Sequence, residues 1–214
     1  MRRLFFFVNL LVIPLLSGWV VYHRLATPPA GVVTPWSFDY FKLALQWPPS
    51  RCSGHPKCPN NFTIHGLWPD NFSGPSLEFC NNRSRYIAIT GPLLQRMQSN
   101  WPNIINHSDT GQTFWTHEWR KHGTCSRFNQ VTYFNSALDR KGQYNFLRNF
   151  RIHRITPGPS SHYPASLIRS TVINLTSKIP DLLCVLHAGQ RLTLHEETYI
   201  FASEEHLFHF RLHG

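Results

Sequence analysis

The chain carries the stretch FTIHGLWPDN at residues 62–71 and the stretch FWTHEWRKHGTC at residues 114–125. The first predicts a strand over 62–68 that runs into a loop. The second predicts a helix over 114–122 that ends at Gly123. Three histidines therefore lie on two regular elements that are far apart in the sequence.

The rest of the sequence adds strands and helices around these two elements. Pro48 and Pro49 end a first strand, and a Gly-Pro pair at 91–92 begins a helix. Strands and helices do not alternate in a βαβ rhythm, so we predict an α+β fold in which helices flank an antiparallel sheet. The further strands are expected over 38–47, 182–186 and 192–201, and two more helices over 133–150 and 166–179.

The composition is typical of a basic protein that meets polyanions. The 214 residues include 21 Lys and Arg against 11 Asp and Glu, a formal charge of +10, and thirteen histidines add positive charge in an acidic compartment. A basic balance alone also fits proteins that meet cell-wall polymers or membranes. No Gly/Ser linker or long charge run divides the chain, so we predict one domain.

The N-terminal region has the composition of a targeting segment. Residues 1–26 combine Arg2 and Arg3 with a long apolar run, which predicts a secretory signal peptide. The run is nearly long enough to span a bilayer, so a signal anchor is the alternative. A Pro-rich lead-in over 27–37 then precedes a single domain over 38–214, and we expect a secreted, extracellular protein.

Sequons and cysteines agree with passage through the secretory pathway. Cys52 and Cys58 are close enough to close a small loop. Cys80 and Cys125 each follow one of the two histidine motifs and can form a disulfide that joins the two regions. Cys184 is then without a predicted disulfide partner. The alternative is a reduced protein with five buried thiols. Five Asn-x-Ser/Thr triplets are expected to be glycosylated at the surface, at Asn61, Asn71, Asn82, Asn106 and Asn174.

Helical spacing gives the second histidine stretch an arrangement that suits phosphate. Residues four apart share a helix face, which pairs His117 with Lys121. The same spacing pairs Glu118 with His122, and a carboxylate beside an imidazole orients it and raises its pKa. RNA cleavage needs such a set, because a base must deprotonate the 2′-OH, an acid must protonate the leaving 5′-oxygen and cations must stabilise the phosphorane.

Two other interpretations of this helix stay open. A solvated polar face explains the same spacing without any function. A zinc site is the second alternative, but zincin helices place their two histidines four residues apart, whereas His117 and His122 are five apart and diverge. No Cys-x-x-Cys pair suggests a zinc site either, so we expect neither a metal nor another cofactor.

Both histidine stretches resemble the two active-site segments of the ribonuclease T2 family, in the family's order. The resemblance extends over about 38–199 and includes LQWPP at 45–49, WPN at 101–103 and YFNSAL at 133–138. It is closest to plant members, among which the S-ribonucleases share the basic charge and the glycosylation. It implies a disulfide-stapled endoribonuclease that cleaves single-stranded RNA through a 2′,3′-cyclic phosphate, leaves DNA intact and acts in plant self-incompatibility; protein partners stay unknown.

The resemblance also implies a role for each active-site position. His122 would be the general base on the 2′-OH, and His65 the general acid toward the 5′-oxygen. Glu118 and Lys121 would stabilise the pentacovalent phosphate, and His117 would help to bind it.

Other residues near these positions fall into two groups. Some match positions that hold a base in relatives, where an aromatic ring is available for stacking. The tryptophans of the two stretches are expected to pack in the core, since large aromatics dominate cores. The base-site positions are Gln46, Ile104, Ile105 and Phe114, and the tryptophans are Trp68, Trp115 and Trp119.

The C-terminal region departs from the family. Plant relatives carry further cysteines after the stretch that matches 194–196, and one of these partners the equivalent of Cys184; this chain has none there. Loss of a native bridge costs a small secreted domain about 2–5 kcal/mol. A catalytically impaired secreted protein that binds RNA or glycans is therefore the alternative to an active enzyme.

Overall fold

The computed structural model describes residues 37–52, 55–156, 163–187 and 191–202. For Ser50, 184–187 and 191–202 only the backbone is described. The predicted signal segment, the lead-in up to residue 36 and the C-terminal residues 203–214 lie outside the described residues. Within the described ranges, no helix has the length and apolar character that a membrane crossing needs.

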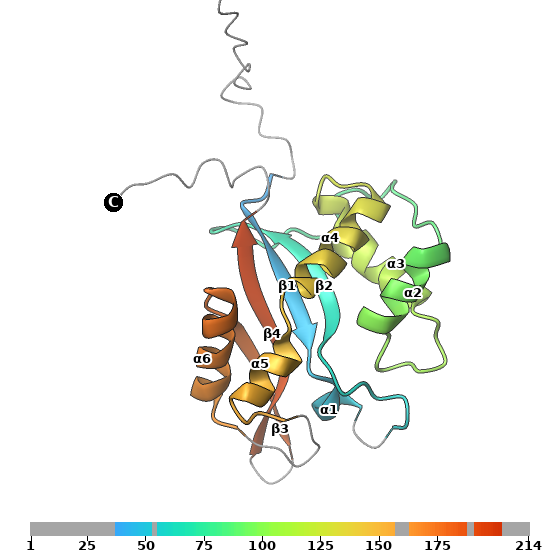
Figure 1. Cartoon of the computed structure of the whole chain (residues 1–214). Helices are drawn as coiled ribbons and strands as arrows, with labels where there is room; N and C mark the ends of the chain where they lie inside the picture. The colour runs from blue at the N-terminus through green and yellow to red at the C-terminus, as the bar shows by residue number, and fades with distance from the viewer. Residues whose placement is uncertain (1–36, 53–54, 157–162, 188–190, 203–214) are drawn as a thin grey trace, which may run out of the picture. The chain divides into compact units, whose positions relative to one another are not determined.

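One antiparallel sheet of four strands, in the order β2-β1-β4-β3, carries the fold (Figure 1). Phe41, Leu43 and Leu45 of β1 alternate along the strand and are buried in the hydrophobic core, as a period of two requires. The α+β fold with an antiparallel sheet is confirmed. The strands are β1 Tyr40–Gln46, β2 Thr63–Asp70, β3 Asp181–His187 and β4 Arg191–Ala202.

A β-bulge in β2 places His65. Ala44 of β1 faces Gly66, and the next residue, Leu45, faces Ile64, so His65 is an extra residue without a cross-strand partner on β1. A bulge bends its strand and changes the direction of a side chain, which is why bulges are common beside active sites. The bulge therefore lets β2 keep its apolar residues in the core while His65 stays partly exposed.

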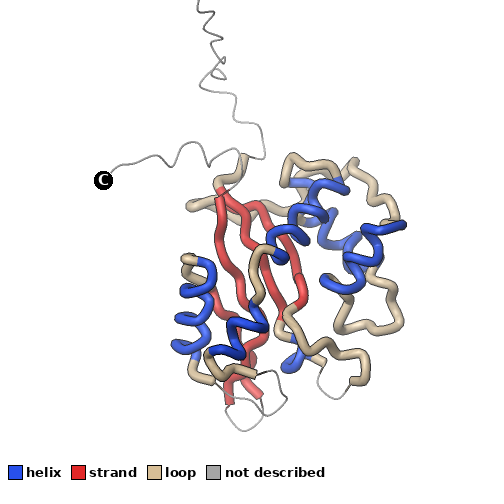
Figure 2. The backbone as a smooth tube through the Cα atoms, viewed as in Figure 1, coloured by secondary structure: helices blue, strands red, loops and turns tan. Residues whose placement is uncertain are grey.

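The helices pack around the sheet in two groups. In Figures 1 and 2, α4 and α5 cross in front of the sheet, whereas α2 and α3 lie beyond the edge formed by β2. Contacts between elements agree, because α4 touches β1, β2 and α2, and α5 packs on α6. The helices are α1 Pro48–Arg51, α2 Gly91–Asn100, α3 Gln112–Lys121, the 3-10 helix η1 Gly123–Cys125, α4 Gln130–Gly142, α5 Phe146–Ile152 and α6 Ala165–Thr176.

Buried aromatic side chains hold the backbone of β2 beside the bulge. The indole N–H of Trp101 donates to the carbonyl of His65 over 2.8 Å, and the hydroxyl of Tyr133 donates to the carbonyl of Leu67 over 2.9 Å. The indole of Trp115 in turn donates to the carbonyl of Trp101. These buried donors satisfy carbonyls that a regular ladder would otherwise pair, so the aromatic core fixes the position of His65.

One predicted helix is divided in the structure, and one short helix was not predicted. The expected helix over 133–150 is two helices, because α4 ends at Gly142 and α5 begins anew. The side chain of Asn145 caps α5 by accepting a hydrogen bond from the backbone N–H of Arg148. Pro48 and Pro49 end β1 as expected, but they also begin the short helix α1, since proline suits the first turn of a helix.

Two disulfides staple the domain, and both expected pairings are confirmed. Cys52 and Cys58 close a loop with a sequence separation of 6, and Cys80 and Cys125 close one with a separation of 45. The second bridge ties the segment after β2 to η1, directly behind the second histidine stretch. Cys184 lies in β3, and its side chain is outside the described part of the chain.

The two disulfides should contribute unequally to stability. The entropy of loop closure predicts a loss of about 4 kcal/mol in the free energy of unfolding for the pair Cys80→Ser and Cys125→Ser, against about 2 kcal/mol for the pair Cys52→Ser and Cys58→Ser. Urea denaturation of the two double variants measures both losses. Equal losses would contradict the assignment of the larger constraint to the longer loop.

Candidate active site

One pocket of about 300 Å³ brings together all five predicted catalytic residues. His65 comes from the bulge of β2, and the others come from α3 and the residue that follows it. The opposite side of the pocket is formed by Lys42 of β1 and by the segment after β2. The lining residues are Lys42, His65, Trp68, Pro69, Asp70, Ser76, Leu77, Glu78, His117, Glu118, Lys121 and His122.

A buried carboxylate joins the two histidine stretches. Glu118 is only 2% exposed, and its Oε2 accepts a hydrogen bond of 3.1 Å from the indole N–H of Trp68. Its other oxygen, Oε1, lies 3.9 Å from Nε2 of His65. Because an unpaired buried carboxylate is costly, these two partners fix where α3 sits against β2.

Trp68 lines the site, so its prediction as a core residue is wrong. Its ring centroid lies 5.2 Å from that of His65 and also 5.2 Å from that of His122. The indole therefore lies near both imidazoles while its N–H holds Glu118. Trp115 and Trp119 are buried in the core, as expected.

Gly66 is required where Trp68 and Glu118 meet. A Cβ atom at this position would overlap Nε1 of Trp68 and Oε2 of Glu118. Both atoms belong to the buried hydrogen bond, so neither can move without breaking it. The glycine of the first histidine stretch therefore leaves room for the contact between β2 and α3.

The segment 76–80 covers one side of the pocket. The Nζ of Lys121 forms an ion pair of 3.0 Å with Glu78, and the backbone N–H of Phe79 donates to the carbonyl of Lys121 over 2.7 Å. The disulfide from Cys80 to Cys125 anchors the end of this segment. Glu78 thus holds the ammonium of Lys121 at the pocket wall.

His122 is buried among cations. Burial, followed by the positive charges of Lys121, His65 and His117, lowers the pKa of His122 to about 3; the backbone of Leu77 acts in the opposite direction. The expected pairing with Glu118, which would have raised this pKa, is wrong, because the Glu118 carboxylate is directed at Trp68 and His65. His122 is therefore neutral at ordinary pH and able to accept a proton.

His117 and Lys121 form the cationic side of the site, as their helical spacing predicts. His117 as a whole is exposed, but its ring is partly shielded from water. This desolvation, followed by the charge of Lys121, lowers the pKa of His117. Opposite them, Lys42 contacts Asp70 over 2.5 Å at the pocket wall. Lys42 and Asp70 had no functional prediction, because neither belongs to a spacing pattern that sequence reasoning recognises.

The four predicted base-site positions differ in exposure. The Phe114 ring is partly buried, with its centroid 5.9 Å from that of His65, and Ile105 is 61% exposed. Gln46 and Ile104 are buried, at 4% and 2% exposed. Phe114 and Ile105 therefore have surface to offer a ligand, and base binding by all four stays a prediction.

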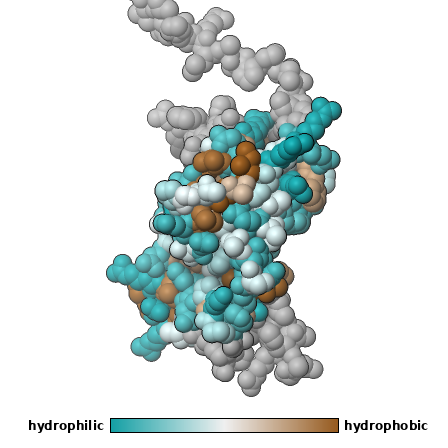
Figure 3. Space-filling model, turned by 90° about the vertical axis from the view of Figure 1, so that its right-hand side faces the viewer, coloured by the Kyte–Doolittle hydropathy of each residue, from teal (hydrophilic) through white to brown (hydrophobic). Residues whose placement is uncertain are grey.

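The predicted glycosylation positions lie at the surface. Asn61, Asn82, Asn106 and Asn174 are exposed and Asn71 is partly exposed, so no packing prevents a glycan there. The face shown in Figure 3 is mostly hydrophilic, with hydrophobic residues in small separate groups. Glycosylation itself stays a prediction.

The histidines of the pocket do not belong to a cluster of metal ligands within the described ranges. In the described residues, no three His, Cys, Asp or Glu side chains gather closely enough to hold a metal ion. The five-residue spacing of His117 and His122 directs them differently, since His117 is exposed and His122 is buried.

Comparison with known proteins agrees with this geometry. The family model described as "Ribonuclease T2 family" matches residues 38–209. The chain belongs to the ribonuclease T2 family. Ribonuclease S-6 of Nicotiana alata is 36% identical over 188 residues, which cover 84% of this chain and 83% of that relative. Other relatives include an intracellular and an extracellular ribonuclease of Solanum lycopersicum.

Solved structures of family members share the fold of this ribonuclease. The self-incompatibility-associated SF11-RNase of Nicotiana alata superposes with a TM-score of 0.70 at 35% identity, covering 78% of this chain and 87% of that one. RNase NT in complex with 5′-AMP superposes with a TM-score of 0.67 at 29% identity, covering 78% and 86%. The chain is therefore a ribonuclease whose relatives include S-ribonucleases.

The electrostatic account of His122 predicts the effect of one substitution. In Lys121→Gln the pKa of His122 should rise above about 3, because a nearby positive charge is removed and the protonated imidazole becomes less unfavourable. It should stay below the ordinary histidine value because burial is unchanged. NMR titration of the imidazole measures the shift.

Arg120→Gln is the matched control, since Arg120 is exposed on the same helix and does not line the pocket. A His122 pKa that moves equally in both variants, or in neither, would contradict a specific effect of Lys121.

Proposed function

We propose that this ribonuclease is a secreted endonuclease that cleaves single-stranded RNA through a 2′,3′-cyclic phosphate, with His122 as general base and His65 as general acid. The observation that carries the proposal is that one pocket is lined both by a neutral, buried His122 and by a His65 beside a carboxylate. General acid–base catalysis needs such a pair, one group able to accept a proton and one able to donate it.

The chemistry proceeds in two steps. His122 takes the proton of the 2′-OH, the 2′-oxygen forms a bond to phosphorus, and the bond from phosphorus to the 5′-oxygen breaks as His65 gives that oxygen a proton. Lys121 and His117 stabilise the charge on the equatorial phosphate oxygens. Water then hydrolyses the cyclic phosphate with the proton roles of the two histidines reversed. DNA has no 2′-OH and is not a substrate.

Glu118 supports this chemistry from the buried wall of the pocket. Its Oε1 lies near Nε2 of His65, so it favours the protonated, proton-donating form of that imidazole. Glu118 is almost fully buried, so it acts on the transition state through His65 and by holding Trp68. Phe114, near the ring of His65, offers a face on which a base of the substrate stacks.

We further propose a role in plant self-incompatibility and extracellular localisation. The relatives named S-ribonucleases, the basic charge and the five sequons support both proposals. A role in pollen rejection requires expression in the pistil, so localisation of the transcript and protein tests it. Protein confined to vegetative tissue or retained inside cells would contradict it.

Replacement of either histidine should abolish most of the activity. Loss of one proton-transfer group costs about 10²–10⁴-fold in rate, so His65→Ala and His122→Ala should each reduce cleavage of single-stranded RNA by that factor. Digestion of RNA with and without EDTA, with single-stranded DNA as a second substrate, measures the effect.

His153→Ala is the matched control, because His153 lies after α5 and does not line the pocket. An active His65→Ala or His122→Ala variant would contradict the assigned roles, and activity lost in EDTA would contradict a metal-independent mechanism.

The pH dependence of kcat/KM should have an unusually low acidic limb. This parameter reports ionisations of the free enzyme, and a base with a pKa of about 3 stays deprotonated until the pH falls to that value. Activity is then lost on the acidic side near pH 3 and on the alkaline side when the acid loses its proton. A pH profile with a dinucleotide substrate measures both limbs; an acidic limb near 6.5 would contradict the buried, cation-flanked environment of the base.

A further inference from the structure

A strongly basic segment lies outside the catalytic pocket. Residues 140–154 contain five Lys and Arg and no Asp or Glu. This segment covers the end of α4, the connection to α5 and α5 itself. The five cations are Arg140, Lys141, Arg148, Arg151 and Arg154.

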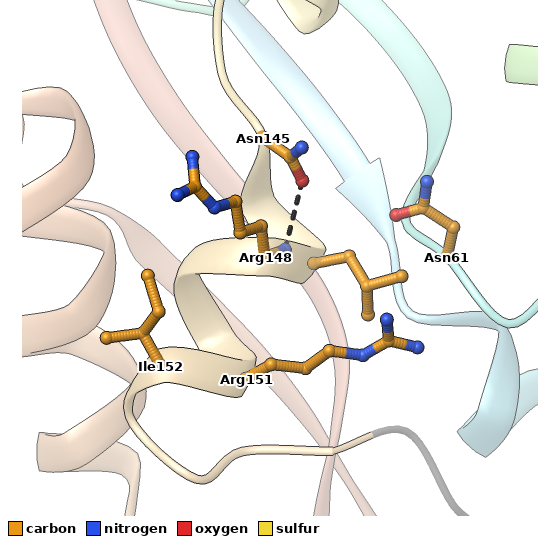
Figure 4. Close-up of a pocket in the computed structure, with 6 residues that line it drawn as sticks. Asn61, Asn145, Arg148, Arg151 and Ile152 are labelled. Carbon is orange, nitrogen blue, oxygen red and sulfur yellow. Dashed lines mark hydrogen bonds between the residues drawn. The ribbon is translucent and has the colours of Figure 1, made fainter.

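Arg148 and Arg151 line an open pocket of about 560 Å³ between α5 and Asn61. Arg148 and Arg151 are exposed, and Figure 4 shows Arg151 extending toward the side of the pocket where Asn61 lies. Asn145 holds the first turn of α5 in place by accepting the N–H of Arg148. On that side the pocket combines the guanidinium of Arg151 with the carboxamide of Asn61, whereas Arg148 extends away from Asn61 (Figure 4).

A second, smaller pocket continues the first. It has a volume of about 210 Å³, shares Asn61 and Asn145 with the larger one and is also lined by Lys141 and Asn100. The ammonium of Lys141 donates to the side-chain oxygen of Asn100 over 2.8 Å. Burial lowers the pKa of Lys141 to about 8.

The three cations that line these two pockets differ from other cations of the protein in having no ion pair with a carboxylate among the described residues. Arg96 pairs with Asp139 over 2.6 Å, and Lys121 pairs with Glu78. Among the described residues, no carboxylate pairs with Lys141, Arg148 or Arg151. An anionic ligand would supply the missing counter-charge, and guanidinium groups match phosphate oxygens in geometry.

The chain connects this basic surface to the catalytic pocket. Asn61 lies four residues before His65 and two before the start of β2, so at about 3.3 Å per extended residue the two positions are at most about 13 Å apart. At a rise of about 3.4 Å per nucleotide, about four stacked nucleotides cover that length. An RNA strand that leaves the catalytic pocket therefore needs only a few nucleotides to reach Asn61.

We propose that the two pockets around Asn61, Lys141, Arg148 and Arg151 bind phosphates of the RNA substrate a few nucleotides away from the scissile bond. The inference rests on the proposed function in that the ligand is the substrate strand. The site holds long RNA by its backbone, independently of sequence, because phosphate contacts carry no base information. Substrates too short to reach it are cleaved without its help.

The test compares long and short substrates in the variant Arg148→Gln/Arg151→Gln. Both side chains are exposed, so the fold is retained. With single-stranded RNA of about twenty nucleotides, KM should rise about fivefold, the scale of two lost exposed ion pairs. The slope of log affinity against log salt should become shallower by about 1.4, or about 0.7 for each lost phosphate contact. With a dinucleotide, kcat and KM should not change.

The matched control is Arg169→Gln/Lys178→Gln, which removes the same charge from exposed positions in and after α6. Because Asn61 lies in a sequon, all proteins are produced in a host without N-glycosylation, which keeps the carboxamide of Asn61 intact. An equal loss of affinity in the control would overturn the proposal in favour of bulk charge. Equal effects on long and short substrates would overturn it in favour of a structural role.

A binding measurement separates this proposal from the proposed chemistry. In a His65→Ala/His122→Ala background, fluorescence anisotropy with a labelled twenty-nucleotide RNA should show the same fivefold loss when Arg148 and Arg151 are replaced. A loss of RNA binding in this background supports the phosphate site independently of catalysis. A wild-type protein that cleaves no dinucleotide would contradict only the catalytic roles of His65 and His122. Unchanged RNA binding, or a loss only with polygalacturonate as the ligand, would overturn the RNA site.

Discussion

The hydrogen bond from the Trp68 indole to the buried Glu118 carboxylate is the constraint on which the site depends. It joins the strand that carries His65 to the helix that carries His117 and Lys121, across fifty residues of sequence. A buried charge without a partner costs several kcal/mol, so α3 has one favourable position against β2. Gly66 leaves the space for this contact, because any Cβ there would occupy it.

The same contact gives the two imidazoles opposite electrostatic surroundings. Glu118 is directed at His65, whereas His122 is buried beside Lys121 and His117, which keeps it neutral. A carboxylate on one side and cations on the other separate a proton donor from a proton acceptor within one pocket. The Glu78–Lys121 ion pair and the Cys80–Cys125 disulfide then hold the wall of the pocket in place.

Sequence reasoning was most successful where a pattern is local. Helical spacing placed His117 and Lys121 on one face, and the Pro48-Pro49 pair marked the end of β1. It failed where contacts are long-range: Glu118 was paired with His122 because they are four apart, but its partners lie on β2. The bulge at His65 was also missed, although an isolated glycine inside a strand pattern, here Gly66, can mark one. The break between α4 and α5 was detectable, since Gly142 and the capping residue Asn145 mark it.

The account's central claim is that Trp68 and Glu118 act as one unit in positioning the catalytic groups. A double-mutant cycle on kcat/KM with Trp68→Phe, Glu118→Leu and the double variant tests it, with a dinucleotide as substrate. Because both substitutions break the same hydrogen bond, the account predicts that the double variant loses less than the sum of the single losses, by about 1 kcal/mol or more. Additive losses would contradict it.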